Sequence, residues 1–233
     1  DLTGDGLDEK IVRRKDGTSV YMTQDIGLAE LKQKEFNTDA SIYVVGDEQN
    51  YHFKVLKLIC QKLQLPASDG IYHLSYGMVE LPTGKMKSRE GTVVDADDLV
   101  DGMIQIAKEK TESLGKVDDF TAAQLEKLYD TIGLGALKFF LLRVDPKKKM
   151  IFNPEESIDF HGFTGPFIQY THARIKSILR KTGTTVTQVG SSLLPLEKAL
   201  AMQLANFSAE VNEAAEALDP SKLAIYAFNL AKL

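Results

Sequence analysis

Cysteine is almost absent from this sequence, which has only Cys60 among its 233 residues. A single thiol excludes a disulfide framework and a cysteine-rich zinc site, and it predicts a reducing compartment, which we expect to be the cytoplasm. No apolar run approaches the ~20 residues that a membrane helix needs, so no membrane partner is expected. The formal net charge is only −5, so any surface that binds nucleic acid must be local.

Hydrophobic residues make up 43% of the chain and charged residues 26%, which indicates a globular protein with a real core. β-branched or apolar runs predict strands at 18–22, 41–46 and 71–76, and the first follows a turn at Lys15-Asp-Gly17. Helical patterns lie between them, near 23–36 and up to Pro66. This alternation predicts a parallel, Rossmann-like α/β sheet with right-handed crossovers.

Ligands of such sheets bind at the carboxyl ends of the strands. We therefore expect residues 21–25, 46–52 and 75–78 to line one crevice. Farther along, the sequence predicts an α-helical bundle, with helices over 97–112, 122–144, 165–181, 192–218 and 221–233. Cys60 lies among leucine and isoleucine at helical spacing, which indicates packing and not reactivity.

Tyr21 and Asp25 are four residues apart at a predicted strand-to-helix junction. A carboxylate beside a phenol suits a planar cation such as a guanidinium. The alternative is that Asp25 merely interacts with the helix dipole. The next strand is followed by the segment Gly46-Asp-Glu-Gln-Asn-Tyr-His52. Its glycine would let a ligand approach the backbone closely, and its side chains offer hydrogen-bonding groups and a titratable ring. The alternative is a capped helix with a histidine on its surface. No second histidine lies at ligand spacing, so a metal site is not predicted.

The segment Gly84-Lys-Met-Lys-Ser-Arg-Glu-Gly91 places three cations and a hydroxyl between two glycines. Such a loop suits a polyphosphate, although it matches neither the Walker nor the dinucleotide fingerprint, and it could be a solvated hairpin. Two basic clusters follow, around Arg143 with Lys147–Lys149 and along residues 172–181 after three aromatic residues. Cations beside aromatic rings suit RNA, but a charged face over core aromatics explains them equally.

These segments together resemble the class I arginyl-tRNA synthetases. Six segments carry the resemblance in family order: Tyr21–Ile26 (YMTQDI), Tyr43–Phe53 (YVVGDEQNYHF), His73–Met78 (HLSYGM), Lys85–Arg89 (KMKSR, similar to the KMSKS-type loop), Ile132–Lys138 (IGLGALK) and Phe160–Arg174 (FHGFTGPFIQYTHAR). The resemblance runs over roughly residues 10–232, and it implies the second half of a Rossmann-like catalytic domain at 1–150, followed by the start of a helical anticodon-binding domain at 151–233.

The resemblance implies an ATP-dependent ligase that makes arginyl-adenylate from L-arginine and transfers the arginyl group to tRNA(Arg). Mg²⁺ would accompany ATP as substrate, with no bound prosthetic group, and the full-length parent would be a monomer. Tyr21 and Asp25 would hold the guanidinium, and Gln49 the amino-acid end. The other implied sites are Gly46, His52, Gly77, Met78 and Lys85 for ATP; Lys85, Lys87, Ser88 and Arg89 for catalysis; and Phe167, Tyr170, Arg174 and Lys181 for tRNA.

Two departures from the family pattern qualify this interpretation. Ser88 stands where the KMSKS pattern has its second lysine, so Lys85, Lys87 or Arg89 could supply the phosphate-stabilising charge. The His-x-Gly-His segment of class I enzymes is missing, because no two of the four histidines are three residues apart. We therefore expect a cut through a larger enzyme, inactive by itself. A non-catalytic RNA-binding protein derived from such an enzyme, or a synthetase for another amino acid, stays open.

Overall fold

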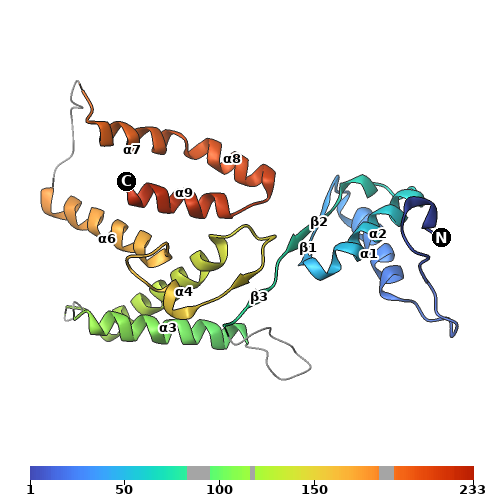
Figure 1. Ribbon diagram of the computed structural model, residues 1–233, viewed down its shortest axis with the longest axis horizontal. Coiled ribbons are helices and arrows are strands. Elements are labelled where there is room, and N and C mark those ends of the chain that lie inside the picture. Colours follow the sequence, from blue (N-terminus) through green and yellow to red (C-terminus); the bar gives the residue numbers. More distant parts are fainter. Residues whose placement is uncertain (83–94, 116–118, 184–191) are drawn as a thin grey trace. The chain divides into compact units, whose positions relative to one another are not determined.

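The computed structural model describes residues 1–82, 95–115, 119–183 and 192–233 (Figure 1). They form two compact units, Asp1–Met78 and Val79–Leu233, each with its own hydrophobic core. None of the helices in these ranges is both long and apolar enough to cross a membrane.

The first unit contains two parallel strands joined by a crossover helix. Strand β1 pairs with β2 in a register that runs from Ser41 opposite Ile71 to Gly46 opposite Tyr76, so both strands end at the same edge. This confirms the two strands and the crossover predicted from the sequence. In chain order the elements are η1 (Thr3–Asp5), α1 (Tyr21–Phe36), β1 (Ser41–Gly46), η2 (Asp47–Gln49), α2 (Asn50–Lys62), η3 (Ser68–Gly70) and β2 (Ile71–Tyr76).

Helix α2 supplies more residues to the core of this unit than any other element does. Val55, Leu56 and Cys60 are fully buried on one face of the helix and cluster with Tyr43 of β1 and Ile71 of β2. The apolar residues whose spacing predicted the helix thus lie on the face that packs against the sheet. Burial raises the pKa of the Cys60 thiol, which keeps it protonated and confirms the packing role expected for it.

The strand predicted at 18–22 is wrong. The Asp-Gly turn is present, since Gly17 has a φ of +85° and the Asp16 carboxylate accepts bonds from the Thr18 amide and hydroxyl. However, only one antiparallel bridge forms, between Arg13 and Ser19, and α1 already begins at Tyr21. The opposite arm of this hairpin is exposed at Ile11 and Val12, so pairing with it would bury little apolar surface. In the described part of this unit the sheet therefore has two strands instead of three.

The second unit is mostly helical, as the sequence predicted. A short parallel pair, in which Val79 lies opposite Met150 and Glu80 opposite Ile151, brackets the α3–α4 hairpin. The division into domains at residue 150 stays a prediction. In chain order the elements are β3 (Val79–Glu80), α3 (Ala96–Ser113), α4 (Ala122–Leu142), β4 (Met150–Ile151), α5 (Pro154–Ser157), α6 (Gly165–Thr182), α7 (Pro195–Ala205), α8 (Phe207–Ala217) and α9 (Ser221–Lys232).

Two contacts fix α6 against the hairpin. A Cβ on Gly165, the first residue of α6, would lie 2.4 Å from the backbone oxygen of Gly135 on α4, so these helices cross with their backbones in contact. The Gln169 side chain donates to the Thr131 carbonyl of α4 at 2.8 Å. The α3–α4 hairpin packs on a hydrophobic core that also includes the fully buried Phe152 and Ile158.

The single helix predicted at 192–218 is wrong, because the chain bends at Asn206 between α7 and α8. The Tyr226 hydroxyl of α9 donates to the Gln203 carbonyl at 2.7 Å, and its ring lies 5.5 Å from that of Phe207. In a continuous helix the Gln203 carbonyl would accept from the backbone N–H four residues later. Here it accepts from a side chain of α9 instead. The bend is a tertiary effect that periodicity does not encode.

Candidate functional site

A carboxylate and an imidazole meet between α1 and α2 in the first unit. His52 Nε2 lies 2.6 Å from Asp25 Oδ2, and the two side chains are 24% and 33% exposed. Because an ionised carboxylate can only accept, Nε2 is the donor when Asp25 is charged. Asp25 is the fifth residue of α1, and the first turn of that helix holds no acidic residue. The helix-dipole explanation of Asp25 is therefore weakened, since that effect is confined to the first turn.

Tyr21 begins α1 and lies one helical turn before Asp25. Residues four apart share a helix face, so the phenol and the carboxylate project on the same side of α1. Tyr21 is 79% exposed. Among the described residues, Asp25 has no cationic partner other than His52. The face therefore offers a free phenol beside a carboxylate that can still accept hydrogen bonds.

The loop after β1 lies against the end of β2. A Cβ at Gly46 would be 3.8 Å from the Tyr76 ring and 3.9 Å from Met78 Sδ, which are ordinary contact distances. Gly46 has a φ of −57°, so its conformation does not demand glycine. Gly77 is buried and Met78 half-buried, whereas Gln49 at the end of η2 is exposed. The structure thus brings residues 46–52 and 75–78 to one edge of the sheet.

Phe53 holds His52 in place. Its ring packs edge-on against the His52 ring at 5.5 Å and stacks on His73 at 4.3 Å. A ring nitrogen of His73 lies 3.0 Å from the Val45 carbonyl. Sequence analysis placed His52 and Asp25 in one crevice without pairing them. The topological signal held for His52, which follows β1, whereas Asp25 was placed there through the strand predicted at 18–22, which does not form.

The N-terminal segment is tied to the start of α2. The Tyr51 hydroxyl donates to Asp8 Oδ2 at 2.7 Å, and Lys10 Nζ lies 4.4 Å from the centre of the Tyr51 ring. The Tyr51 hydrogen bond and the Lys10 charge lower the pKa of the exposed Asp8 carboxyl. This contact holds when Asp8 is ionised and weakens as the pH falls through its lowered pKa.

The cationic loop predicted to bind phosphate lies outside the described residues, so Lys85, Lys87, Ser88 and Arg89 have no structural account here. Within the described ranges, no group of three or more His, Cys, Asp or Glu side chains is placed to hold a metal ion.

Helix α6 in the second unit carries the residues predicted to bind tRNA. Tyr170 is 48% exposed, and the Arg174 guanidinium lies 5.8 Å from its ring centre. Lys181 is exposed as well. Phe167 differs, because it is half-buried and packs 5.1 Å from the ring of Phe228 on α9. Tyr170, Arg174 and Lys181 thus share an accessible surface, and Phe167 supports it from beneath.

Arg143, one of the basic residues considered for RNA binding, contributes to packing instead. Its guanidinium lies 3.9 Å from the Phe140 ring centre, donates to the Phe163 carbonyl at 2.6 Å and bonds Glu156 at 2.7 Å. Its side chain is 13% exposed. Lys147–Lys149, by contrast, are exposed. A sequence cannot distinguish these cases, because the partners of Arg143 are brought to it by the fold.

Comparison with known proteins identifies the class. Residues 1–153 match the family described as tRNA synthetases class I (R), catalytic domain, and residues 168–233 match the DALR anticodon binding domain. The chain therefore belongs to the class I tRNA synthetases, as the sequence motifs predicted. Within that class, the family that it matches is the (R) family, which covers both the Asp25–His52 site and the cationic loop.

Relatives and solved structures agree with this assignment. An "Arginine--tRNA ligase" of Flavobacterium psychrophilum is 55% identical over 234 residues, which is 100% of this chain and 39% of the relative. One of Amoebophilus asiaticus is 53% identical over 239 residues, covering 40% of its length. The Thermus thermophilus arginyl-tRNA synthetase structure superposes with a TM-score of 0.84 at 28% identity, covering 96% of this chain and 42% of that one. The chain thus spans about 40% of the length of the curated relatives that it matches.

Proposed function

We propose that this chain is part of an arginine–tRNA ligase. The observation that carries the proposal is the Asp25 carboxylate, hydrogen-bonded to His52 and one helical turn from the exposed Tyr21, in a chain of the class I (R) family. In the first step an arginine carboxylate oxygen attacks the α-phosphorus of ATP, and pyrophosphate leaves. In the second step a hydroxyl of the terminal adenosine of tRNA(Arg) attacks the arginyl carbonyl, and AMP leaves.

Arginine is recognised through its planar side chain. The Asp25 carboxylate accepts two parallel N–H bonds from the guanidinium, and the Tyr21 phenol bonds or stacks on the same plane. A lysine ammonium cannot reproduce this fork, so the pair selects arginine over lysine by geometry as well as by charge. Gln49, exposed at the end of η2, is assigned to the amino-acid end of the substrate.

ATP is assigned to the edge where β1 and β2 end. Gly77 and Met78 follow β2 and would contact adenine, while Gly46 leaves the backbone accessible beside them. His52, which the resemblance implied for ATP, lies at the same edge, but its observed contact is with Asp25. Lys85, Lys87, Ser88 and Arg89 would close on the phosphates, where positive charge stabilises the charge that develops in the transition state. Mg²⁺ would arrive with ATP, bound mainly by phosphate oxygens and water.

The direct test is arginylation by the protein expressed from its whole reading frame. We expect it to charge tRNA(Arg) with arginine and to exchange pyrophosphate with ATP only when arginine and tRNA(Arg) are both present. Exchange driven equally by another amino acid would contradict the assignment to arginine. Binding of RNA without any arginine-dependent exchange would favour the non-catalytic alternative. We also propose a cytoplasmic monomer, which light scattering of the purified protein and fractionation of the cells would test.

The cationic loop is expected to affect the rate and not the affinity for arginine. Replacing Lys85 and Lys87 together by alanine should lower kcat of the exchange reaction by about 100-fold or more, because each substitution removes a positive charge that stabilises the transition state. The arginine KM should change by less than about threefold. Lys34→Ala is the matched control, since Lys34 is a surface lysine of α1 that pairs with Glu30 at 2.7 Å. An unchanged kcat in the double variant would contradict this role.

His52 is expected to act as a positioning residue for Asp25. His52→Ala should raise the arginine KM by about 10-fold, because a hydrogen bond to a charged group is lost, while kcat changes little. His52→Gln retains a donor and should recover most of the affinity. A fall in kcat with an unchanged arginine KM would instead place His52 on ATP, and equal losses in both variants would contradict the hydrogen-bond explanation.

A further inference from the structure

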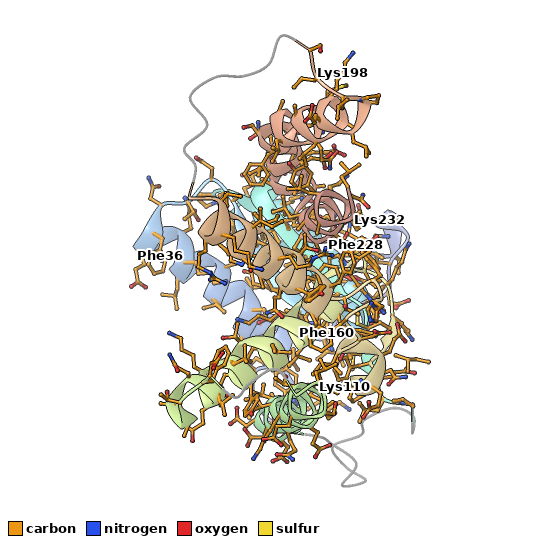
Figure 2. The ribbon with its side chains drawn as sticks, turned by 90° about the vertical axis from the view of Figure 1, so that its left-hand side faces the viewer. Phe36, Lys110, Phe160, Lys198, Phe228 and Lys232 are labelled. Carbon is orange, nitrogen blue, oxygen red and sulfur yellow. The ribbon has the colours of Figure 1, made fainter. Side chains whose placement is uncertain are left out.

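A cavity of about 730 Å³ opens in the second unit, and none of its lining residues is assigned to arginine or ATP. It is formed where the end of α3, the beginning of α4, residues 158–161 and α6 meet. Two of its lining residues, Lys110 on α3 and Phe160, are labelled in Figure 2. Its volume lies within the range of about 300–1,000 Å³ that is typical of small-ligand pockets.

The walls of this cavity carry three aromatic rings from separate segments. Phe120 precedes α4, Phe160 follows α5, and Tyr170 lies on α6. Phe120 and Tyr170 are 43% and 48% exposed, so their rings are accessible to an incoming group. Rings that stay exposed around a cavity favour a flat, stackable ligand.

The lining also has unused hydrogen-bonding capacity. His161 is exposed and lines the cavity with a ring nitrogen that can donate or accept. Ser113 at the end of α3 is exposed as well, and its hydroxyl, which donates to the Lys110 carbonyl at 2.8 Å, can still accept a hydrogen bond. The ligand should therefore have a polar edge as well as a flat face.

Helix α6, which lines the cavity through Tyr170 and Ala173, is strongly basic. This helix contains no Asp or Glu, and its four cations, Arg174, Lys176, Arg180 and Lys181, are all exposed. In the part of the chain that the structure describes, none of the four forms an ion pair. Arg174 lies over the ring of Tyr170, which lines the cavity. Phosphates are thus favoured directly beside a cavity suited to a flat ring.

We propose that this cavity, the α3–α6 pocket, takes one unstacked nucleobase of an RNA whose backbone runs along α6. The base stacks on Phe120, its polar edge faces His161, and the adjoining phosphate lies by Arg174. Splayed bases stacked on aromatic side chains are the usual way in which proteins read single-stranded RNA. The inference rests on the proposed function, since the RNA would be tRNA(Arg).

The pocket is tested by blocking it in the full-length protein. Ala173 lines the cavity from an exposed position on α6, so Ala173→Trp fills the pocket without disturbing the core. We expect the Kd for tRNA(Arg) to rise by about 10-fold, the effect of losing one stacked base. Ile175→Trp is the matched control, because Ile175 is exposed on the same helix but does not line the cavity. It should change the Kd by less than about twofold.

Phe120→Ala identifies the occupant. It should weaken binding of tRNA(Arg) by about 10-fold, and a photo-crosslinker placed at position 173 should label one nucleotide. For a tRNA(Arg) that lacks the base of that nucleotide, the wild-type protein and Phe120→Ala should then have the same Kd. An unchanged Kd in Ala173→Trp and Phe120→Ala, with arginylation intact, would overturn the pocket alone. A lower Tm of Ala173→Trp with an unchanged Kd would show that a protein segment fills it, which also overturns the proposal. Failure of the wild-type protein to bind tRNA(Arg) would overturn the proposed function as well.

Discussion

Asp25→Asn in the full-length protein should raise the arginine KM by about 100-fold or more. The substitution keeps the size of the side chain and its ability to accept from His52 Nε2, 2.6 Å away, so the fold is preserved. It removes the negative charge and replaces one guanidinium acceptor with an amide group that donates. Removing one partner of a shielded, hydrogen-bonded charge pair costs about 2–5 kcal/mol, or about 30-fold to several-thousand-fold in affinity, a range that includes this change. Steady-state ATP–pyrophosphate exchange measures it.

Glu30→Gln is the matched control for Asp25→Asn. Glu30 also lies on α1, but its carboxylate is exposed and pairs only with Lys34 at 2.7 Å. Surface pairs of this kind contribute little, so the arginine KM should change by less than about twofold. An arginine KM of the Asp25→Asn protein within threefold of the wild-type value would remove Asp25 from the arginine site.

Gly70→Ala should destabilise the first unit by about 3 kcal/mol. Gly70 ends η3, directly before β2, and a Cβ there would lie 2.0 Å from the Asp39 carbonyl oxygen and 2.8 Å from Ala40 Cα. Both neighbours are backbone atoms of the chain that enters β1, so they cannot rotate away. Either β1 or the start of β2 has to shift, and overpacking against a rigid neighbour costs about 1–3 kcal/mol or more. Hydrogen exchange of the β1 and β2 amides measures the loss.

Gly27→Ala provides the opposite expectation within the same unit. Gly27 is in the middle of α1, and nothing lies within 4 Å of a Cβ placed there. Alanine should therefore stabilise the unit by about 0.5–1 kcal/mol through its helix propensity. Gly70→Ala should change the hydrogen-exchange protection of the β1 and β2 amides more than Gly27→Ala does. If it did not, residues 39–40 would not lie in close contact with Gly70.

The segments that the sequence predicted well are those in which local pattern and burial agree. β1 is an apolar, β-branched run, β2 contains Ile, Leu and two Tyr, and α2 has its apolar residues at helical spacing, with Val55, Leu56 and Cys60 fully buried. In the segment predicted as a strand at 18–22, Val20 and Met22 do pack on the core, but helix α1 begins at Tyr21 and the opposite arm of the hairpin is exposed. Local preference decides the structure only where tertiary contacts support it.

The candidate site follows the same division. Sequence analysis brought Tyr21, Asp25 and Gln49 together through a family resemblance. The predicted topology placed Gln49 at the edge where β1 ends, but it placed Tyr21 and Asp25 there through a strand at 18–22 that does not form. It did not pair Asp25 with His52, because the 26 residues between them leave the distance undefined. It also grouped Arg143 with exposed lysines, whereas the aromatic rings and the carbonyl that hold Arg143 come from α4 and the segment before α6.

The central claim is that Asp25 reads the charge of a guanidinium, and citrulline tests it most directly. Citrulline matches arginine in shape and planarity but is neutral. The account predicts that the wild-type protein prefers arginine to citrulline by a large factor in kcat/KM for ATP–pyrophosphate exchange in the presence of tRNA(Arg). Asp25→Asn should shrink that preference by about 100-fold. If the preference were the same in the wild-type protein and in Asp25→Asn, the assignment of the arginine site to Asp25 would be contradicted.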